Sequence, residues 1–445
     1  MSESIGSSGT GMKLHTKILL GLGLGAAAGV TANLTVGPEN PTIQAINTYV
    51  AGPIGQIFLR MLFMVVMPLV FASISLGVAG LGDIRKVGRV GGKAVGYFFV
   101  TTVLAATLGL IVVNLMAPWE RVSPETRQEL MARFADDAST RVEAAATTAK
   151  FGPETFVNIV PRNVIDAAAR TDLLGIIFFG LVFGAALTLI PPEKAQPMVA
   201  VLEALNEVVI RIIHFAMLLA PFGVAGLIFT VSSGFGFDLL IAVAAYVVTV
   251  LIALALHVGL TLSAIVRFVI GISPVTFFNR VKSALVTAFS TSSSSATLPT
   301  ALEVAEEQLG VPRTIAGFVL PIGSTMCMNG TSIFEGITVI FVAEIFGVDL
   351  SIPQMAIVMI MSVITAIGAA GVPGGSIPLL VGIMTMFGVP GEGIAIVLGV
   401  DRILDMSRTT VNVASDLTAT TFVARSEGVW TPGDLRSSES GPQVD

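Results

Sequence analysis

The stretch GVDRILDMSRTTVNVASDLTATTFVA, residues 399–424, decides how the rest of the chain can fold. As a helix with about 100° per residue, it places its polar and charged side chains on one stripe about 80° wide. The stripe consists of Asp401, Asp405, Arg408, Asn412 and Asp416. Arg402 lies off the stripe, and the opposite face is apolar. Whether such a helix lies in water or in a membrane depends on the composition around it.

The composition indicates a membrane protein. Hydrophobic residues make up 53% of the 445 residues, and Asp, Glu, Lys and Arg only 12%, whereas soluble proteins carry about 25% charged residues. These values exclude disordered chains, collagen-like repeats and disulfide scaffolds, and the net charge of −6 argues against a nucleic-acid binder. One cysteine, Cys327, allows no intrachain disulfide, and three scattered histidines form no metal cluster. We therefore expect a polytopic membrane protein.

Six windows are long enough to span a bilayer, which takes about 20 apolar residues per helix. They are residues 18–36, 52–80, 94–117, 173–190, 198–231 and 239–270. The first is long enough to span and lacks a cleavage site, so no cleaved signal is expected. Residues 273–425 remain apolar, but Gly, Pro, Ser, Thr and Asn interrupt them repeatedly.

Lys and Arg set the expected orientation, because cytoplasmic loops carry an excess of them. Lys13 and Lys17 precede the first window. Between the second and third windows lie Arg85, Lys86, Arg89 and Lys93, and at or after the end of the sixth lie Arg267, Arg280 and Lys282. Both termini are therefore expected in the cytoplasm, with residues 1–12 disordered. The hydrophilic residues 118–157 are expected outside as a solvated loop, in which 124–146 favours a short amphipathic helix.

The charged stripe predicts a functional site, because charges inside a span are costly unless paired or hydrated. One alternative is an inert ion-pair network of Asp401 or Asp405 with Arg408. That network leaves out Asp416, which has no basic partner within helical reach. A lone buried carboxylate takes up a proton or binds a cation.

Three interrupted segments precede the charged helix. The serine run SSSSATLP (292–299) predicts a hairpin whose Ser side chains cap the following helix. TMCMNGTSIFEG (325–336) predicts a helix unwound at Asn329–Gly330, with carbonyls free to bind Na⁺. GVPGGSIP (371–378) predicts a tight tip with exposed N–H groups. The order of hairpin and helix occurs twice, as in the inverted repeats of transporters.

With these motifs, the sequence resembles the dicarboxylate/amino acid:cation symporter family over about residues 13–428. FSTSSSSATLP and GVPGG match the tips of its two hairpins, and DRILDMSRTTVNVASD matches its last helix. The resemblance implies an all-α protein of the cell inner membrane, with eight transmembrane helices, two re-entrant helical hairpins and inverted repeats. It also implies a homotrimer whose protomers each hold a scaffold (13–92 and 158–235) and an elevator-type transport domain (93–117 and 236–425), with 426–445 as a cytoplasmic tail.

The resemblance further implies symport of L-glutamate and L-aspartate, with no enzymatic activity and no cofactor besides Na⁺ or H⁺ as coupling ions. Arg408 would pair with the side-chain carboxylate of the substrate and Asp405 with its amino group. The other implied substrate-binding residues are Ser293, Ser294, Thr331, Val372, Pro373, Ser376, Thr409 and Asn412. A C4-dicarboxylate would be repelled by Asp405, and a neutral amino acid would leave Arg408 without a partner. A membrane enzyme lacks a nucleophile–base pair here, and hairpin gates argue against a passive channel.

Three cation sites follow from the same resemblance. One uses the Asp416 carboxylate with backbone of Gly323, Cys327 and Asn412, and another uses backbone of Thr325, Ala366, Ile367 and Ala369. The third uses Thr101, Thr102 and an Asn-Met-Asp-Gly-Thr motif, which here reads Cys327-Met328-Asn329-Gly330-Thr331. A buried Na⁺ without a carboxylate is uncompensated. We therefore expect this site to be lost and coupling to use fewer Na⁺ ions, or protons carried by Asp416, Asp401 or Glu335. Asn329→Asp is then expected to increase sodium dependence.

Overall fold

The computed structural model describes residues 14–80, 84–123, 126, 128, 160–169, 173–369, 371, 373–389 and 391–435. All regular elements in these ranges are helical. The first half contains α1 (Leu14–Val36), α2 (Pro41–Ile46), η1 (Asn47–Ala51), α3 (Gly52–Phe63), α4 (Val66–Gly80), α5 (Ile84–Met116), η2 (Pro118–Arg121), α8 (Val164–Ala169), α9 (Leu173–Leu189) and α10 (Pro192–Leu256). Residues 1–12, Val372 and nearly all of the predicted helix 124–146 lie outside the described residues.

The second half begins with two short π-helices that continue α10. Its elements are η3 (His257–Leu262), η4 (Ile265–Ile270), α11 (Pro274–Thr291), α12 (Ser294–Glu303), η5 (Val304–Gln308), α13 (Arg313–Met326), α14 (Asn329–Ile345), α15 (Ile352–Gly368), α16 (Ile377–Met386), η6 (Gly391–Ile394), α17 (Ala395–Leu398), α18 (Asp401–Ser426) and η7 (Pro432–Asp434). The pairs α11–α12 and α15–α16 are the two helical hairpins predicted around the serine run and the glycine-rich tip.

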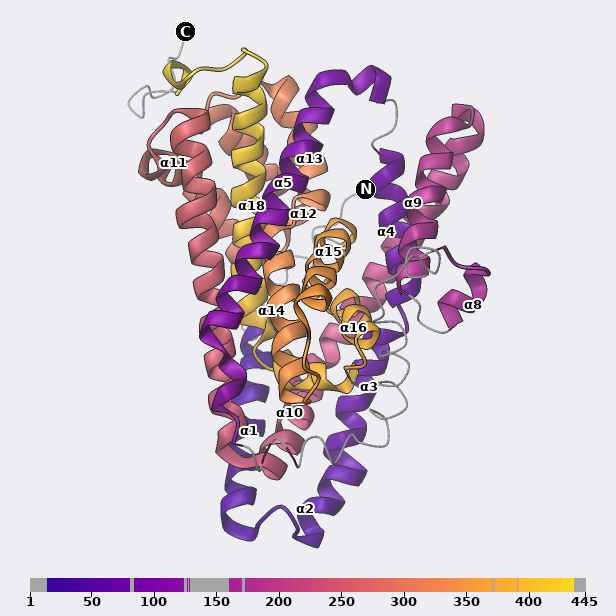
Figure 1. Ribbon diagram of the computed structural model, residues 1–445, viewed down its shortest axis with the longest axis vertical. Coiled ribbons are helices and arrows are strands. Elements are labelled where there is room, and N and C mark those ends of the chain that lie inside the picture. Colours follow the sequence, from indigo (N-terminus) through magenta and orange to yellow (C-terminus); the bar gives the residue numbers. More distant parts are fainter. Residues whose placement is uncertain are drawn as a thin grey trace, which may run out of the picture.

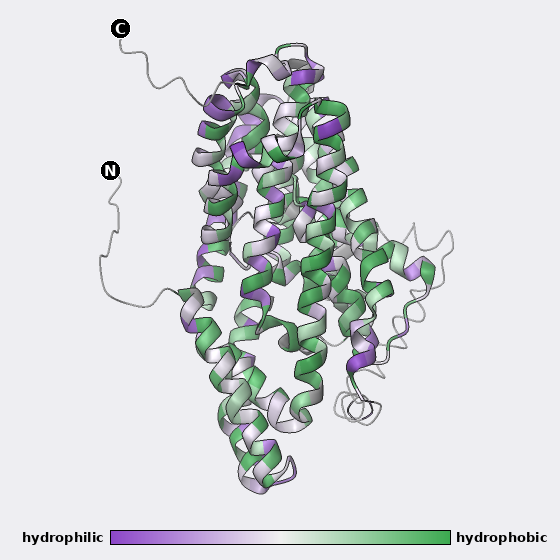
Figure 2. Ribbon diagram, turned by 90° about the vertical axis from the view of Figure 1, so that its left-hand side faces the viewer, coloured by the Kyte–Doolittle hydropathy of each residue, from purple (hydrophilic) through white to green (hydrophobic). Residues whose placement is uncertain are grey.

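Six helical stretches in the described part of the chain are long and apolar enough to cross a membrane. They are Thr16–Val36, Pro41–Leu76, Arg89–Arg121, Pro192–Phe237, Leu239–Ile270 and Arg313–Ile345. Apolar residues cover most of the helical body (Figure 2). The predicted window 173–190 forms the 17-residue helix α9, which is shorter than these six. The chain is therefore a helical, multi-pass type of membrane protein.

The windows 198–231 and 239–270 form two separate helical stretches, as expected, Pro192–Phe237 and Leu239–Ile270, which meet at a kink inside α10. Only Gly236 departs from helical geometry inside it, with φ 65° and ψ −143°. Glycine adopts positive φ without steric cost, so one residue redirects the chain and no polar loop is required. The Asn33 amide donates a hydrogen bond to the Ser233 carbonyl at 3.0 Å beside this kink.

Close helix packing on one side of the molecule depends on small residues. Gly21, Gly25 and Gly29 of α1 follow one another at four-residue spacing and face α10. A methyl group at Gly25 would lie 2.5 Å from the Ala225 carbonyl oxygen. Membrane helices approach closely through such small-residue stripes, so α1 is fixed against the first half of α10.

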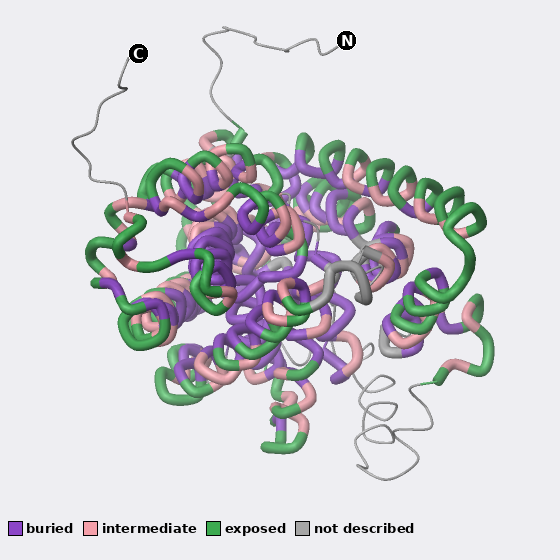
Figure 3. Tube along the Cα trace, turned by 90° about the horizontal axis from the view of Figure 1, so that it is seen from above, coloured by how far each residue is buried: buried purple, intermediate pink, exposed green. Residues whose placement is uncertain are grey.

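The buried centre of the molecule is α14, whose residues are almost all inaccessible. It packs against α5, α15 and α18, and Figure 1 shows it between them. Seen from above, buried residues fill the middle and exposed residues lie on the outer helices (Figure 3). A helix buried on all sides can carry polar side chains only where other helices satisfy them.

Two predicted boundaries were wrong by a few residues. The break between α13 and α14 falls at Cys327 and Met328, whose backbones are non-helical, rather than at Asn329–Gly330. The Asn412 side chain accepts a hydrogen bond from Gly330 N at 2.7 Å, which allows α14 to begin two residues earlier than the sequence indicates. The charged stretch was treated as a helix from residue 399, but α18 starts at Asp401, after α17 has ended at Leu398.

Candidate functional site

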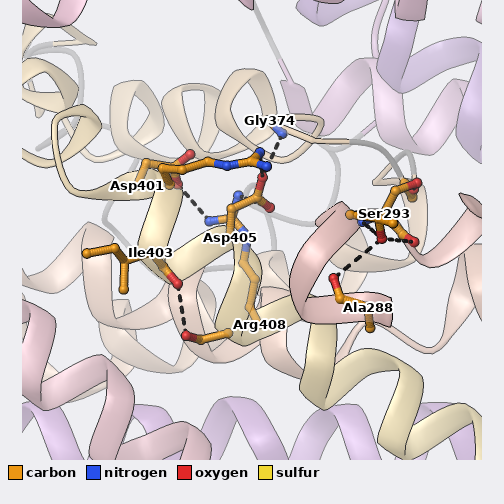
Figure 4. A network of polar contacts seen from close by, with 11 residues as sticks. Ala288, Ser293, Gly374, Asp401, Ile403, Asp405 and Arg408 are labelled. Carbon is orange, nitrogen blue, oxygen red and sulfur yellow. Dashed lines mark hydrogen bonds and ion pairs between the residues drawn. The ribbon is translucent and has the colours of Figure 1, made fainter. Parts of the chain in front are cut away.

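The tips of the two hairpins meet. Ser292 adopts the left-handed conformation with φ 52°, and Ser293 caps α12 by accepting a hydrogen bond from Ala296 N at 3.1 Å. The Ser293 hydroxyl also donates to the Gly371 carbonyl at 2.6 Å, and Ser295 N donates to the same carbonyl at 3.2 Å. The serine run therefore closes its own turn and joins it to the tip of the second hairpin (Figure 4).

Arg408 of α18 lies in a buried ion-pair cluster. Its Nη1 donates a hydrogen bond to Asp401 Oδ1 at 2.8 Å, and its Nη2 lies 2.9 Å from Asp405 Oδ1. The guanidinium carbon stands 4.1 Å above the centre of the Phe334 ring. The second carboxylate oxygen, Asp405 Oδ2, accepts a hydrogen bond from Gly374 N at 3.1 Å (Figure 4). The ion pairs considered from the sequence are therefore present, with both aspartates rather than one.

Asn412, one turn beyond Arg408, joins α18 to the start of α14. Its amide nitrogen lies 3.1 Å from Thr331 Oγ1, and its carbonyl oxygen receives the Gly330 N–H. Gly330 is the residue that allows this approach, because a methyl group there would collide with the Arg408 carbonyl oxygen. The first turn of α14 is therefore held directly against the charged helix.

A small cavity of about 20 Å³ lies between these elements. Such a volume holds about one water molecule, so a larger ligand can enter only if the surrounding elements move apart. The cavity is lined by Ser292, Ser294, Met328, Thr331, Ala369, Gly371, Ser376, Asp405, Arg408, Thr409 and Asn412. The hydroxyls of Ser292 and Ser376 are buried and have no hydrogen-bond partner in the described part of the chain, which leaves them available to a ligand.

Seven of the ten expected substrate-binding residues line this cavity: Ser294, Thr331, Ser376, Asp405, Arg408, Thr409 and Asn412. Ser293 and Pro373 belong to the adjoining tips but are not part of the lining, and Val372 lies outside the described residues. The lining also includes Ser292, Met328 and Gly371, which were not expected. All three belong to the predicted motifs 292–299, 325–336 and 371–378, so the motifs gave their position without their role.

The first expected cation set is brought together around Asp416. A methyl group at Gly323 would lie 2.7 Å from Asp416 Oδ1, so the carboxylate rests against this part of α13. Asp416 Oδ1 is buried without a hydrogen-bond partner in the described residues. Such an orphaned oxygen suits a cation or a proton. In the described residues, no three His, Cys, Asp or Glu side chains gather into a conventional metal site.

The second expected set comes from the carboxyl ends of two helices. Thr325 lies near the end of α13, while Ala366, Ile367 and Ala369 lie at the end of α15. Helix carboxyl ends carry partial negative charge and unpaired carbonyls, which favours cations. No hydrogen bond among the described residues links the two ends, and the Thr325 hydroxyl donates to its own helix at Ile322.

The third expected set, Thr101, Thr102 and Asn329, is gathered in one place. Thr102 Oγ1 lies 2.8 Å and Thr101 Oγ1 3.5 Å from Asn329 Oδ1. The Asn329 amide nitrogen lies 3.0 Å from Ser415 Oγ and 3.2 Å from His257 Nε2. His257 and Ser415 were missed by sequence reasoning, because His257 belongs to no motif and Ser415, although part of the stretch 399–424, was given no role there.

Two further charged residues lie beside the site. Glu335 is fully buried in α14, where its Oε2 accepts a hydrogen bond from Thr365 Oγ1 at 2.7 Å and its Oε1 has no partner in the described residues. Arg402, placed off the charged stripe by its helical angle, brings its Nη1 within 3.9 Å of Asp405 Oδ2. The helical angle misses this contact because a long side chain can bend back toward the stripe.

Residues 14–426 match the sodium:dicarboxylate symporter family. The chain is 36% identical over 420 residues to the proton/sodium-glutamate symport protein of Bacillus subtilis, covering 94% of each chain. It is 34% identical over 375 residues to the proton/glutamate-aspartate symporter of Escherichia coli, covering 84% of this chain and 85% of that one. It is also 32% identical over 406 residues to the C4-dicarboxylate transport protein of Bacillus subtilis, covering 87% and 94%. Since the match extends over nearly the whole chain, the protein belongs to the sodium:dicarboxylate symporter family.

Proposed function

We propose that this protein is a secondary active symporter that takes up L-glutamate and L-aspartate, driven by a cation gradient. The observation that carries the proposal is the buried pairing of Arg408 with Asp405 at the wall of a small polar cavity. An acidic amino acid presents two carboxylates and one ammonium group. A site with one arginine and one aspartate, both at most 6% exposed in their side chains, is complementary to that pattern.

In this proposal, Arg408 binds the side-chain carboxylate of the substrate through its planar fork. Asp405 binds the ammonium group, and Asn412 and Thr331 help to hold the main-chain carboxylate. The unpartnered hydroxyls of Ser292 and Ser376 offer two more donors. Because Arg408 is already paired with Asp401 and Asp405, the substrate has to exchange with at least one of these aspartates.

The second hairpin is proposed as the gate. Its tip contributes Gly371, which is hydrogen-bonded to the first hairpin, and Gly374, which is hydrogen-bonded to Asp405. Binding of an ammonium group to Asp405 would compete with the Gly374 N–H. Substrate entry and movement of this tip are therefore coupled through one carboxylate.

C4-dicarboxylate transport is the second candidate, supported by the similarity to the C4-dicarboxylate transport protein of Bacillus subtilis. Asp405 argues against it. A dicarboxylate has no ammonium group to neutralise this carboxylate, and two like charges brought together out of water repel each other.

For coupling, we propose either Na⁺ bound at Asp416 or a proton carried by Glu335 or Asp416. Both carboxylates have one oxygen without a hydrogen-bond partner in the described residues. Asp401, the third carrier considered from the sequence, is occupied by Arg408 at 2.8 Å and fits this role less well. The named proton/sodium-glutamate relatives are consistent with either ion.

The proposed architecture is that of the resembled family. It comprises a homotrimer in the inner membrane with cytoplasmic termini, a scaffold of 13–92 and 158–235, and a transport domain of 93–117 and 236–425 that moves as an elevator. The single non-helical residue of α10, Gly236, lies at the proposed boundary between scaffold and transport domain.

Calorimetric titration of the purified protein with L-aspartate, succinate and L-alanine tests the substrate assignment. We expect binding of L-aspartate only, in the presence of Na⁺ or at acid pH. Asp405→Asn should weaken L-aspartate and relieve the repulsion of succinate, whereas Ser407→Ala on the exposed side of α18 should change neither. Tighter binding of succinate than of L-aspartate by the wild-type protein would favour the dicarboxylate candidate.

A further inference from the structure

His257 contributes to a polar network that the proposed transport mechanism leaves unexplained. The network joins four elements: α5 through Thr101 and Thr102, the α10–η3 junction through His257, α14 through Asn329 and α18 through Ser415. All five side chains are buried, with at most 1% of any residue exposed. His257 stands where α10 changes to π-helical η3, and π-turns often mark functional positions.

Asn329 is the centre of this network, and both its amide nitrogen and its oxygen have hydrogen-bond partners in it. Its two amide hydrogens point to His257 Nε2 at 3.2 Å and Ser415 Oγ at 3.0 Å, and its oxygen faces Thr102 Oγ1 at 2.8 Å. An asparagine side chain has two donors and one acceptor oxygen, so each of these groups has a partner. The network satisfies Asn329 without any bound ion.

These residues do not fit a sodium ion. The five side chains Thr101, Thr102, His257, Asn329 and Ser415 include no carboxylate, and the amide hydrogens of Asn329 carry partial positive charge. A buried cation needs negative charge or several free oxygen lone pairs. The oxygen of Asn329 instead receives a hydroxyl hydrogen bond. We therefore infer that the hydrogen-bond network takes the place of the third cation site implied by the resemblance, rather than only lowering its affinity for sodium.

His257 and Asn329 each provide a hydrogen-bond partner for the other. The His257 Nε2 contact with Asn329 is the one hydrogen bond of the ring in the described structure, since Nδ1 is buried without a partner. A buried imidazole without any hydrogen bond would be unfavourable. The two residues thus form a matched pair, although they are 72 positions apart.

We propose that His257 is a specificity-determining residue for the coupling ion, and that its hydrogen-bonded pair with Asn329 takes the place of a third bound cation. This inference rests on the proposed function as a cation-coupled symporter. It also changes the expectation for Asn329→Asp. The new carboxylate oxygen would lie next to His257 Nε2, which can donate a hydrogen bond to it, so the carboxylate would have a partner without Na⁺.

The test is the number of Na⁺ ions transported per substrate, measured from the sodium gradient that balances an opposing substrate gradient in proteoliposomes. Asn329→Asp alone should leave this number unchanged. Asn329→Asp combined with His257→Ala should raise it by one, because the carboxylate then lacks its nitrogen partner. His214→Ala, which removes an exposed histidine of α10, is the matched control and should have no effect. A gain of one ion from Asn329→Asp alone, or no gain in a double variant that still transports, overturns the proposal.

A second variant tests the wild-type network without requiring a new site. Thr102→Val keeps the shape of the side chain and removes the hydroxyl that faces Asn329. We expect a lower melting temperature and an unchanged sodium dependence of that temperature in purified protein without substrate. A rightward shift of the sodium titration by tenfold or more would mean that Thr102 binds sodium and would contradict the proposal. Because this readout needs no transport, it stays valid if the substrate assignment fails.

Discussion

Removal of the Arg408 guanidinium is the single change that we expect to weaken substrate binding most. Arg408→Ala takes away the group that pairs with Asp401 at 2.8 Å and with Asp405 at 2.9 Å, and that stands 4.1 Å from the centre of the Phe334 ring. It also removes the only arginine that lines the cavity in the described structure. The cavity lining would then present the Asp405 carboxylate and no arginine to an acidic amino acid.

The size of the effect follows from burial. Truncating one partner of a buried, hydrogen-bonded charge pair costs about 2–5 kcal/mol, and about 1.4 kcal/mol corresponds to a tenfold change in affinity. The expected loss in L-aspartate affinity is therefore about 30-fold to 4,000-fold. Because the Arg408 side chain is only 2% exposed, water screens the lost interaction poorly, and the upper half of this range is expected.

Isothermal titration with L-aspartate measures this loss, with size-exclusion chromatography to show that the variant remains folded. Arg425→Ala is the matched control, because Arg425 lies on the same helix but is exposed near its end. The control should bind within about threefold of wild type, a difference of less than 1 kcal/mol. Wild-type affinity in a folded Arg408→Ala protein would refute the assignment of Arg408 to the substrate carboxylate.

Three further predictions concern residues that support the site, in α14 and at or beyond the end of α18. Gly330→Ala should abolish substrate binding, because its methyl group would collide with the backbone of Arg408, whereas Gly317→Ala, with nothing within 4 Å, should bind normally. Trp430→Ala should destabilise the protein by about 3–5 kcal/mol, seen as a lower melting temperature, since Trp430 is 1% exposed and donates to the Leu309 carbonyl at 2.7 Å; exposed Val429→Ala is its control. The hydrogen bond from Arg89, with a further contribution from Lys93, holds the pKa of Glu427 below its ordinary value of 4.5. Its stabilising contribution is therefore present above that value and lost as the pH falls through the lowered pKa, so the wild-type melting temperature should fall more steeply than that of Glu427→Gln in acid, and parallel curves would contradict this.

The charged helix could be predicted well because its information is local. Helical periodicity alone places Asp401, Asp405 and Arg408 on one stripe, and the structure pairs Arg408 with both aspartates. The sequence left open which aspartate would pair, since both lie within one or two turns of the arginine. That choice depends on side-chain geometry and on the Gly374 N–H, which comes from another element.

Contacts between distant segments could not be predicted in the same way. The serine run was expected to form a capped hairpin, but nothing in its sequence indicates that Ser293 bonds to Gly371. His257 lies in an apolar window with no motif around it, and its partner Asn329 becomes visible only when α10 and α14 are packed together. Such long-range pairs are set by the tertiary arrangement of the helices and leave no local signal in either segment.

Helix boundaries were less predictable than helix existence. The two apolar windows 198–231 and 239–270 were correct in place, yet their sequence did not indicate that the single residue Gly236 redirects the chain between them. Similarly, the break before α14 shifted by two residues because the Asn412 side chain stabilises its first turn at Gly330. In both cases, a local signal identified the region, and a contact from elsewhere fixed the residue.

Uptake of radiolabelled L-aspartate into proteoliposomes tests the central proposal most directly. Inward Na⁺ and inward H⁺ gradients are compared with no gradient and with liposomes that lack the protein. We expect accumulation above the external concentration with at least one of the two gradients, and its collapse when that gradient is dissipated. Uptake that only equilibrates, or that is the same with and without a cation gradient, would contradict the account.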